Sequence, residues 1–478
     1  MTARGRGAGH TGAVTAAPAT VDARALADRL RSAYDAGLTR PLPWRRTQLR
    51  GLDRLLVDGE RELLAALRSD FGKPDLEAWL TELAHVRHEL AHIQSHLAAW
   101  ARPERVPLRA VLRPGSATTV AEPLGVALVL APWNYPVHLL LLPMAYAVAA
   151  GNAVVGKPSE LAPATSATLA RLLPRYLDER TTALVEGDAA VATTLLEERW
   201  DHVFYTGNGR IGRVVMAAAA RHLTPVTLEL GGKSPAIVER SADLAVAARR
   251  IVWGKFVNAG QTCVAPDYVL VDEPVAEALL AKLAEAVRSL YGDDPAASPD
   301  LARIVDDRHV ERLAGLLAGV GPDRLVTGGR VDRATRYVAP TVVRTAGGDD
   351  PLMHDELFGP ILPVITVRDV GAAIAAVRAR DKPLALYVFT EDTGVAERVV
   401  AETSSGGVCV NGTLVHLAVT DLPFGGVGAS GIGAYHGRAG FETFSHRKGV
   451  LVRRSHPDPG LMYPPYGRAA RWVLRRLG

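Results

Sequence analysis

Residues 258–267 read NAGQTCVAPD and contain Cys263, one of only two cysteines among the 478 residues of the chain. A cysteine thiolate is a strong nucleophile near neutral pH and attacks electrophilic carbon atoms such as those of carbonyl groups. A lone cysteine is nevertheless more often a small buried hydrophobic residue than a reactive one. A catalytic role for Cys263 therefore depends on which other functional groups the chain brings to it.

A glycine-rich turn upstream of Cys263 indicates a dinucleotide cofactor. In FYTGNGRIGRVV, residues 204–215, Gly207, Gly209 and Gly212 fit the pattern G-x-G-x-x-G between a predicted strand and a predicted helix. Backbone N–H groups at such a turn bind a pyrophosphate. The pattern also occurs in tight turns that bind nothing, so the flanking strand and helix are what favour a cofactor site.

Glu229, in the stretch TLELGGKSP, is a candidate for two different roles. The dinucleotide rule expects an acidic residue about 20 positions after the glycines to bind the ribose hydroxyls, and Glu229 stands near that distance. A glutamate at the end of a strand and before two glycines could equally be a general base that faces a cleft. The spacing leaves both roles open.

Two loops that follow short apolar strands add further polar groups. In APWNYP, residues 131–136, Asn134 is flanked by prolines and aromatic residues that restrict its position. Its side-chain amide could be a preorganised donor to an oxyanion, or it could hydrogen-bond to the backbone of the turn. In VVGKPSE, Lys157 and Glu160 leave a strand together. This pair suits a phosphate or a ribose, and it is also typical of a solvated loop.

The C-terminal part of the chain is rich in turns. The stretch HDELFGP places Glu356 and Phe358 in one of them, and residues 422–437 are dense in glycine. Glycine at this density permits close backbone approach or positive φ angles without indicating a particular chemistry. The second cysteine, Cys409, lies in the apolar stretch GGVCVNG and is predicted to be a packing residue.

The elements that must position these groups fall into two blocks. Residues 21–103 have helical periodicity, and beyond residue 123 short apolar strands alternate with helices, which predicts a parallel sheet buried on both faces. A second alternating block follows Gly232, so we expect two α/β domains that meet at a cleft. Residues 104–122 and 406–450 fit neither block and could be strands that cross to a neighbouring subunit.

Composition excludes several classes of protein. With 48% hydrophobic and 22% charged residues the chain is typical of a globular protein, and a net charge of +4 is too small to indicate a nucleic-acid partner. Two cysteines cannot form a disulfide framework, so we expect a reducing compartment, the cytoplasm. The most apolar stretch, residues 139–150, is too short for a transmembrane span, and residues 1–20 resemble a disordered leader rather than a secretory signal.

The last residues of the chain have the pattern of an amphipathic helix. Arg468, Arg471 and Arg475 recur at helical spacing with Trp472 and Val473 between them. This pattern favours a surface helix or a helix that packs in a dimer. Peripheral contact with anionic lipid is a less favoured alternative.

The motifs together resemble the aldehyde dehydrogenase superfamily. They occur in the same order and with similar spacing, and they are PWNYP, KPSE, YTG…G, LELGGKSP, GQTC, ELFGP and PFGGVGASG. The resemblance extends over roughly residues 21–465, and the ending LPFGGVGASGIGAYHGRAGFETFSHRKGVLVR is most similar to the class 3 branch, which includes fatty- and aromatic-aldehyde dehydrogenases.

The resemblance implies an aldehyde dehydrogenase-like α/β fold and a division into parts. A Rossmann-type NAD(P)-binding domain would comprise residues 21–103 and 123–228, and a catalytic α/β domain residues 229–405. Residues 104–122 and 406–450 would be β-strands used for oligomerisation, followed by a tail at 451–478. It also implies a homodimer.

The resemblance further assigns the site residues. Cys263 would be the nucleophile and Glu229 the general base that activates the hydrolytic water, while Asn134 would form an oxyanion hole with the backbone N–H of Cys263. The residues that would contact the cofactor are Lys157, Glu160, Gly207, Asn208, Gly209, Arg210, Ile211, Gly212, Glu356 and Phe358. The role of Glu229 is thus settled by resemblance and not by spacing.

The expected reaction is oxidation of an aldehyde to a carboxylic acid with NAD, with NADP as an alternative cofactor and without a metal. The expected substrate is a medium- or long-chain aliphatic or an aromatic aldehyde. Ala429, Gly156 and Arg210 depart from the usual class 3 pattern and bear on cofactor preference and substrate range. The alternatives are a thiol-dependent esterase or hydrolase and a non-catalytic binding protein with the same fold.

Overall fold

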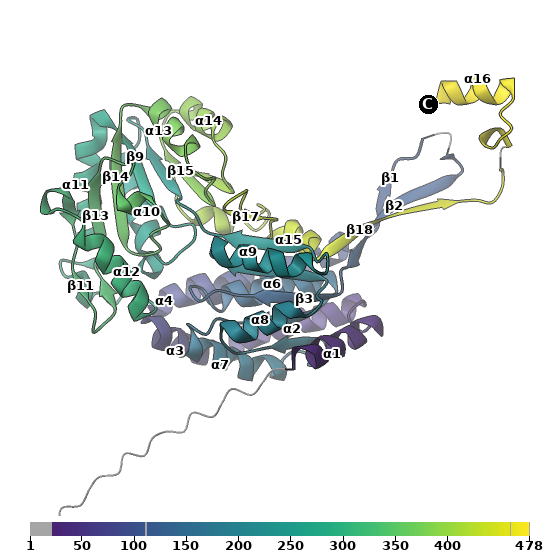
Figure 1. Cartoon of the computed structure of the whole chain (residues 1–478), viewed down its shortest axis with the longest axis horizontal. Helices are drawn as coiled ribbons and strands as arrows, with labels where there is room; N and C mark the ends of the chain where they lie inside the picture. Colours follow the sequence, from purple (N-terminus) through teal and green to yellow (C-terminus); the bar gives the residue numbers. More distant parts are fainter. Residues whose placement is uncertain (1–21, 110–111, 459, 478) are drawn as a thin grey trace, which may run out of the picture.

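The computed structural model describes residues 22–109, 112–458 and 460–477, so the predicted leader at 1–20 lies outside the described residues. Two mainly parallel β-sheets lie side by side, each covered by helices, and a narrow arm extends away from both (Figure 1). This arrangement confirms the predicted α/β class.

The N-terminal helices pack against the first sheet. The side chain of Asp22 accepts a hydrogen bond from the backbone N–H of Ala25 at 2.9 Å and so caps the first helix. The helical elements of this region are α1 (Ala23–Asp35), α2 (Leu42–Asp58), α3 (Glu60–Phe71), α4 (Asp75–Ala78), a π-helical turn (Trp79–Ala84) and α5 (His85–Trp100).

The first sheet has six strands in the order β17-β7-β6-β3-β4-β5. Its strands are β3 (Val126–Leu130), β4 (Ala153–Lys157), β5 (Thr182–Leu184), β6 (His202–Gly207), β7 (Val226–Leu230) and β17 (Gly431–Ile432). The first five pair in parallel, and β17 adds an antiparallel edge. The chain runs outward from β3 to β5 and then returns to the other side of β3, so the strand order reverses between β3 and β6. Ligands of open α/β sheets bind at such a reversal.

Both faces of this sheet are buried, because successive residues of a strand point to opposite faces. In β3, Ala127 and Val129 contact the core that α2, α3 and α5 share, whereas Leu128 contacts the core on the opposite face, where α1 packs. The helices between the strands are α6 (His138–Ala150), α7 (Pro163–Leu172), α8 (Ala189–Glu197) and α9 (Gly209–Ala220). Every residue of α6 is buried, so the apolar stretch at 139–150 is a core helix.

The second sheet has seven strands in the order β10-β13-β14-β9-β8-β15-β16. They are β8 (Pro235–Val238), β9 (Tyr268–Asp272), β10 (Leu325–Thr327), β13 (Thr341–Thr345), β14 (Ile361–Val367), β15 (Ala385–Phe389) and β16 (Gly407–Val410). Only the edge strand β10 pairs antiparallel within it. Its helices are α10 (Leu244–Phe256), α11 (Ala276–Tyr291), α12 (Asp307–Ala318), α13 (Val370–Arg378) and α14 (Thr393–Glu402), and a small hairpin comprises β11 (Val331–Asp332) and β12 (Tyr337–Val338).

The arm comprises β1 (Glu104–Val106), β2 (Gly115–Pro123) and β18 (Ser445–Arg453). Strands β2 and β18 pair antiparallel along their whole length, from Pro123 opposite Ser445 to Gly115 opposite Arg453. The helix α15 (Gly437–Thr443) leads into β18, and α16 (Arg468–Leu477) lies at the far tip of the arm (Figure 1). None of the helices formed by the described residues is long and apolar enough to cross a bilayer.

The structure corrects one part of the predicted organisation. Residues 406–450 were expected to form bridging strands, but β16 belongs to the seven-stranded sheet and β17 to the six-stranded sheet. Only the last residues of this range enter β18 of the arm. The boundary expected after residue 228 also falls inside β7, because Glu229 and Leu230 continue the pairing with β6. The division into cofactor, catalytic and oligomerisation parts remains a prediction.

Candidate active site

Four of the predicted site residues meet at the carboxyl edge of the first sheet. Lys157 is the last residue of β4, Gly207 is the last residue of β6, and Glu229 lies one residue before the end of β7. Asn134 follows β3 by four residues. Parallel strands place their carboxyl ends on one side, so the topology brings together residues that are far apart in the sequence.

Cys263 comes from the second sheet, in the loop just before β9. The loop begins in a short 3-10 turn (Val257–Gly260) in which Asn258 and Ala259 both have φ of 51°. Two consecutive non-glycine residues in the left-handed region are strained, and such strain persists only where neighbouring contacts hold the backbone in place. The sequence pattern did not predict this conformation.

The side chain of Gln261 holds the strained loop. Its Nε2 donates to the carbonyl oxygens of Asn258 at 2.9 Å and Arg303 at 3.0 Å, and its Oε1 accepts from the backbone N–H of Val305 at 2.9 Å. The residue is fully buried. Gln261 is therefore a positioning residue that sequence reasoning missed, although it lies inside the GQTC motif.

The loops of Asn134 and Cys263 are joined directly by hydrogen bonds. Asn134 Nδ2 donates to the carbonyl oxygen of Gln261 at 2.9 Å, and Asn258 Nδ2 donates to the carbonyl oxygen of Asn134 at 2.8 Å. The hydroxyl groups of Tyr135 and Thr262 lie 2.7 Å apart. One N–H of the Asn134 amide is used in this way, and the amide has a second N–H to donate.

Glu229 is a buried carboxyl group whose charge acts on the thiol of Cys263. It is only 3% exposed, and neither of its carboxyl oxygens has a hydrogen-bond partner among the described residues. Burial raises the pKa of Glu229 well above its usual value, because a desolvated carboxylate is disfavoured. A carboxyl group with a raised pKa is a stronger base once it has lost its proton, as general-base catalysis near neutral pH requires.

Burial and nearby charges also shift the pKa of the Cys263 thiol. Burial raises the pKa of the Cys263 thiol, and the nearby charges of Glu356 and Glu229 raise it further. Backbone N–H groups at Cys263 and Val264 lower this pKa and oppose the effect. The resting thiol is therefore protonated and needs a base to accept its proton before it can attack a carbonyl carbon.

Glu356 and Phe358 reach the site from the loop before β14. A Cβ atom on Gly231 would lie 1.9 Å from Oε2 of Glu356, so the carboxyl group packs directly on the glycine backbone. Asp267 accepts a hydrogen bond from the backbone N–H of Leu357 at 3.1 Å and anchors the loop. The ring of Phe358 meets the ring of Trp133 edge to face, with 5.3 Å between their centres. Loops from both sheets thus contribute residues to the candidate site.

Glu356 predicts a pH dependence of stability. Its burial, together with the charge of Asp267, raises the pKa of Glu356 from 4.5 to about 8. The proton that Glu356 keeps in the native state stabilises the fold below about pH 4.5, and this contribution is lost as the pH rises through 8. We expect Glu356→Gln to reduce the fall in stability between pH 5 and 8, by up to about 1.4 kcal/mol per pH unit. Urea unfolding midpoints across this range measure the effect, and equal slopes in both proteins would contradict it.

The glycine-rich turn connects β6 to α9. A Cβ atom at Gly207 would lie 2.1 Å from the hydroxyl oxygen of Tyr205, and one at Gly212 would lie 3.0 Å from Leu230. The chain is therefore closely packed at both positions, with little space for a side chain. At Gly209 the nearest atom would be 3.5 Å away, so packing does not require glycine there. Asn208 caps α9, because its Oδ1 accepts from the backbone N–H of Ile211 at 3.0 Å. Arg210, in the same turn, is exposed.

The remaining predicted residues and the second cysteine are also placed. Lys157 is 5% exposed, and its Nζ lies 3.0 Å from Oε2 of the exposed Glu160, so the two form an ion pair at the end of β4. Cys409 lies in β16 and packs against the core of the second sheet.

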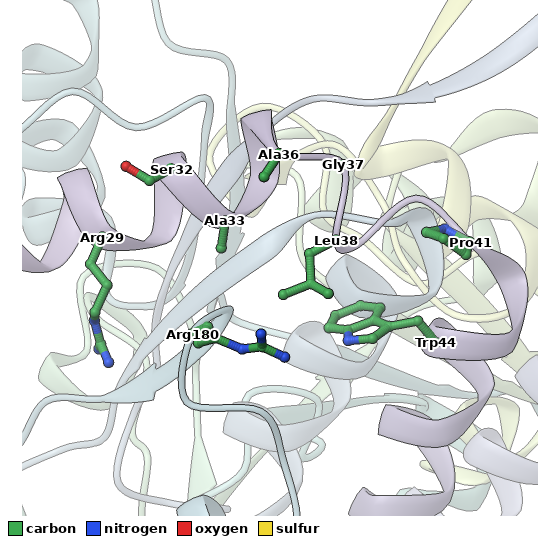
Figure 2. A pocket seen from close by; sticks show the side chains of 9 residues that line it. All are labelled: Arg29, Ser32, Ala33, Ala36, Gly37, Leu38, Pro41, Trp44 and Arg180. Atoms are coloured by element: carbon green, nitrogen blue, oxygen red, sulfur yellow. The ribbon is translucent and has the colours of Figure 1, made fainter.

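A surface hollow between α1 and α2, lined by Arg29, Leu38 and Trp44, contains none of the site residues (Figure 2).

Known proteins are similar to this chain in sequence and in fold. The model of the aldehyde dehydrogenase family matches residues 8–450. The rat dimeric NADP-preferring aldehyde dehydrogenase is 46% identical over 425 residues, which cover 89% of this chain and 93% of the relative. Aldehyde dehydrogenase family 3 member H1 of Arabidopsis thaliana is 45% identical over 460 residues, which cover 96% of this chain and 95% of the relative.

Solved structures with a similar fold belong to the same kind of enzyme as these relatives. The substrate-bound state of Staphylococcus aureus AldH superposes with a TM-score of 0.93 at 38% identity and covers 95% of this chain and 99% of that one. An NAD-dependent aldehyde dehydrogenase from Sinorhizobium meliloti gives a TM-score of 0.82 at 29% identity, with 92% of this chain and 88% of that one covered. The resemblance inferred from the motifs is thereby confirmed, and the chain is an enzyme that belongs to the aldehyde dehydrogenase family.

Proposed function

We propose that the protein oxidises an aldehyde to the free carboxylic acid with NAD(P), through a covalent intermediate on Cys263. The observation that carries this proposal is the hydrogen-bonded connection between the loops of Asn134 and Cys263, beside the buried carboxyl group of Glu229. A nucleophile, an oxyanion donor and a base are the three groups that acyl chemistry on a thiol needs.

Residues of the first sheet would hold the cofactor. The close backbone turn at Gly207 and the N-terminus of α9 suit its pyrophosphate, and the ion pair of Lys157 with Glu160 suits a ribose. Glu356 and Phe358 would lie on the nicotinamide side, next to the thiol loop. When it is bound, NAD(P) supplies the acceptor for the hydride that leaves the substrate carbon.

The side chains account for the other steps. The Cys263 sulfur forms a bond to the aldehyde carbon as its proton passes to a water molecule, and the charge that develops on the carbonyl oxygen is stabilised by Asn134 and the backbone N–H of Cys263. Loss of a hydride from the resulting thiohemiacetal leaves a thioester on Cys263. Glu229 then takes a proton from water, whose oxygen bonds to the thioester carbon, and the C–S bond breaks to release the acid.

A medium- or long-chain aliphatic or an aromatic aldehyde is the proposed substrate class, and NAD the preferred cofactor. The test is aldehyde-dependent reduction of NAD and NADP with a panel of aldehydes of increasing chain length. Ester cleavage without any cofactor reduction would instead favour the thiol hydrolase, for which the glycine-rich turn has no use.

Glu160 predicts the cofactor preference. Its carboxylate offsets the charge of Lys157 in the ion pair, so a 2′-phosphate would meet no net positive charge there. We expect kcat/KM to be higher with NAD than with NADP, and we expect Glu160→Gln to shift the ratio toward NADP. Steady-state kinetics with both cofactors measure the shift. The rat relative is described as NADP-preferring, so a wild-type preference for NADP would contradict the role given to Glu160.

Asn134 is expected to stabilise the oxyanion. Replacement of Asn134 by alanine should lower kcat by about 10²–10³, or about 2.7–4 kcal/mol of barrier, because one preorganised donor is lost. The affinity for NAD should stay within a factor of a few, since the amide faces the thiol loop and not the glycine-rich turn. Stopped-flow kinetics and cofactor titration separate the two effects. Loss of cofactor affinity with unchanged kcat would contradict the assignment.

We also propose a homodimer and a cytoplasmic location. The arm exposes Val106, Leu451 and Val452, and a relative of this chain is described as dimeric. Exposed apolar side chains on a projecting sheet are typical of an interface between subunits. Light scattering of the purified protein tests the dimer. The basic tail forms α16 at the tip of the arm, and contact of this helix with anionic lipid remains the less favoured alternative.

A further inference from the structure

Three histidines from distant parts of the chain come together where α5, α6 and the start of α15 meet. His85 is the first residue of α5, His138 is the first residue of α6, and His436 precedes α15. One ring nitrogen from each lies within 4.8 Å of those from the other two. The centres of the His85 and His138 rings are 4.6 Å apart, and those of His85 and His436 are 5.7 Å apart. No step of the proposed reaction uses them.

The Nε2 atoms of all three histidines are buried and have no hydrogen-bond partner among the described residues. His436 is only 2% exposed, and His138 is also buried. Buried polar atoms almost always have a partner, since an unsatisfied one is costly. Three histidines that each have an unsatisfied nitrogen, and whose rings bring one nitrogen each within 4.8 Å of the others, therefore point to a common ligand with a positive charge.

The surroundings of His436 are those of a metal-binding histidine. Its Nδ1 donates to Oε1 of the buried Glu89 at 3.2 Å, and Oε2 of Glu89 accepts from the hydroxyl group of Tyr146. A carboxylate on the far nitrogen of an imidazole fixes the tautomer that leaves Nε2 available, and it raises the basicity of that atom.

We infer that His85, His138 and His436 form a binding site for a divalent transition-metal ion, with zinc as the ion of reference. Imidazole nitrogen is a preferred ligand of zinc, and three histidines leave one coordination position open. Bonds of about 2.0–2.1 Å in a tetrahedron separate the nitrogens by about 3.4 Å, so small rotations of the rings suffice. His85 is the only one of the three that is partly exposed. The sequence alone predicts no metal, and the titration below tests the two alternatives.

The site is close to the catalytic loops but separate from them. The ring of Tyr135 lies 6.5 Å from that of His138, and the ring of Tyr435 lies 4.4 Å from that of His436. Cys263, Asn134 and Glu229 are not among its ligands. The inference therefore does not depend on the proposed function, and its test needs no turnover.

The test is calorimetric titration of the metal-free full-length protein with Zn²⁺. We expect saturation at one equivalent per chain, and at least a ~100-fold loss of affinity in His85→Phe and in His138→Asn, since the loss of a ligand exceeds the ~10–100-fold effect of an outer partner. Glu89→Gln should weaken binding by about 10–100-fold. His88→Phe is the matched control, because this histidine is exposed on the same helix, and it should bind as the wild type does.

The thiol is the competing ligand and is removed in a parallel titration. Cys263→Ser should bind Zn²⁺ like the wild type, and anomalous scattering from zinc-soaked crystals should place the ion about 2.0–2.1 Å from three imidazole nitrogens. Circular dichroism establishes that each variant is folded. The inference is overturned if binding disappears in Cys263→Ser, if it is unchanged in both His85→Phe and His138→Asn, or if the wild type shows no saturable site.

Discussion

Cys263→Ala should abolish aldehyde oxidation while the protein continues to bind its cofactor. Without the sulfur no thiohemiacetal forms, and the loss of a catalytic nucleophile costs about 10⁴–10⁶ in kcat in comparable enzymes. The cofactor residues at the carboxyl edge of the first sheet keep their contacts, because none of them depends on the thiol. Aldehyde-dependent NADH formation and a fluorescence titration with NAD measure the two properties.

Cys409→Ala is the matched control for this variant. Cys409 lies in β16 of the second sheet and packs against its core, so its truncation should affect stability more than turnover. If Cys263→Ala retained substantial dehydrogenase activity, or if Cys409→Ala were the inactive variant, the nucleophile would be assigned to the wrong residue.

Glu229→Gln should accumulate the acyl-enzyme. The amide keeps the size of the side chain but cannot take a proton from water, and the loss of a general base slows such a step by about 10²–10⁴. Attack and hydride loss can still occur, so a first turnover should be seen as a burst of NADH before the slow hydrolysis. Intact-protein mass spectrometry should show the mass of the acyl group on the variant during turnover.

The double variant Cys263→Ala with Glu229→Gln identifies the position of the adduct, because it should carry none. An acyl group that persists in the double variant would lie on another nucleophile. A single variant Glu229→Gln that turns over at the wild-type rate, without an adduct, would show that Glu229 is not the base and would restore its alternative role at a ribose.

Much of the site could be predicted because it lies in short contiguous motifs. Asn134, Lys157 and Gly207 each follow or end an apolar strand, and the carboxyl ends of parallel strands converge whatever the details of packing. Helical periodicity likewise predicted the N-terminal helices, and the apolar stretch at 139–150, too short for a transmembrane span, forms a buried helix. Local pattern and topology were sufficient in these cases.

The features that could not be predicted depend on contacts between distant segments. The left-handed backbone at Asn258 and Ala259 is held by contacts with distant residues: Gln261 bonds to Arg303 and Val305, and Asn258 to Glu77. Spacing alone also left Glu229 between two roles, because both require a carboxyl group near the glycine-rich turn.

Two further misses have the same physical origin. Residues 406–450 were assigned to bridging strands, since glycine-rich segments have little periodicity, and only tertiary pairing shows that β16 and β17 join different sheets. The three histidines stand at positions 85, 138 and 436, and no local spacing indicates that α5, α6 and the start of α15 bring them together.

The contact between Gly231 and Glu356 limits how this enzyme can be redesigned. A methyl group at position 231 would overlap the carboxyl oxygen, so any side chain there would displace the end of Glu356. The backbone that carries Glu356 is held separately, through the hydrogen bond of Leu357 to Asp267. Libraries aimed at new cofactor analogues should therefore keep glycine at 231 when this carboxyl group has to stay in place, and vary it only when the group is meant to move.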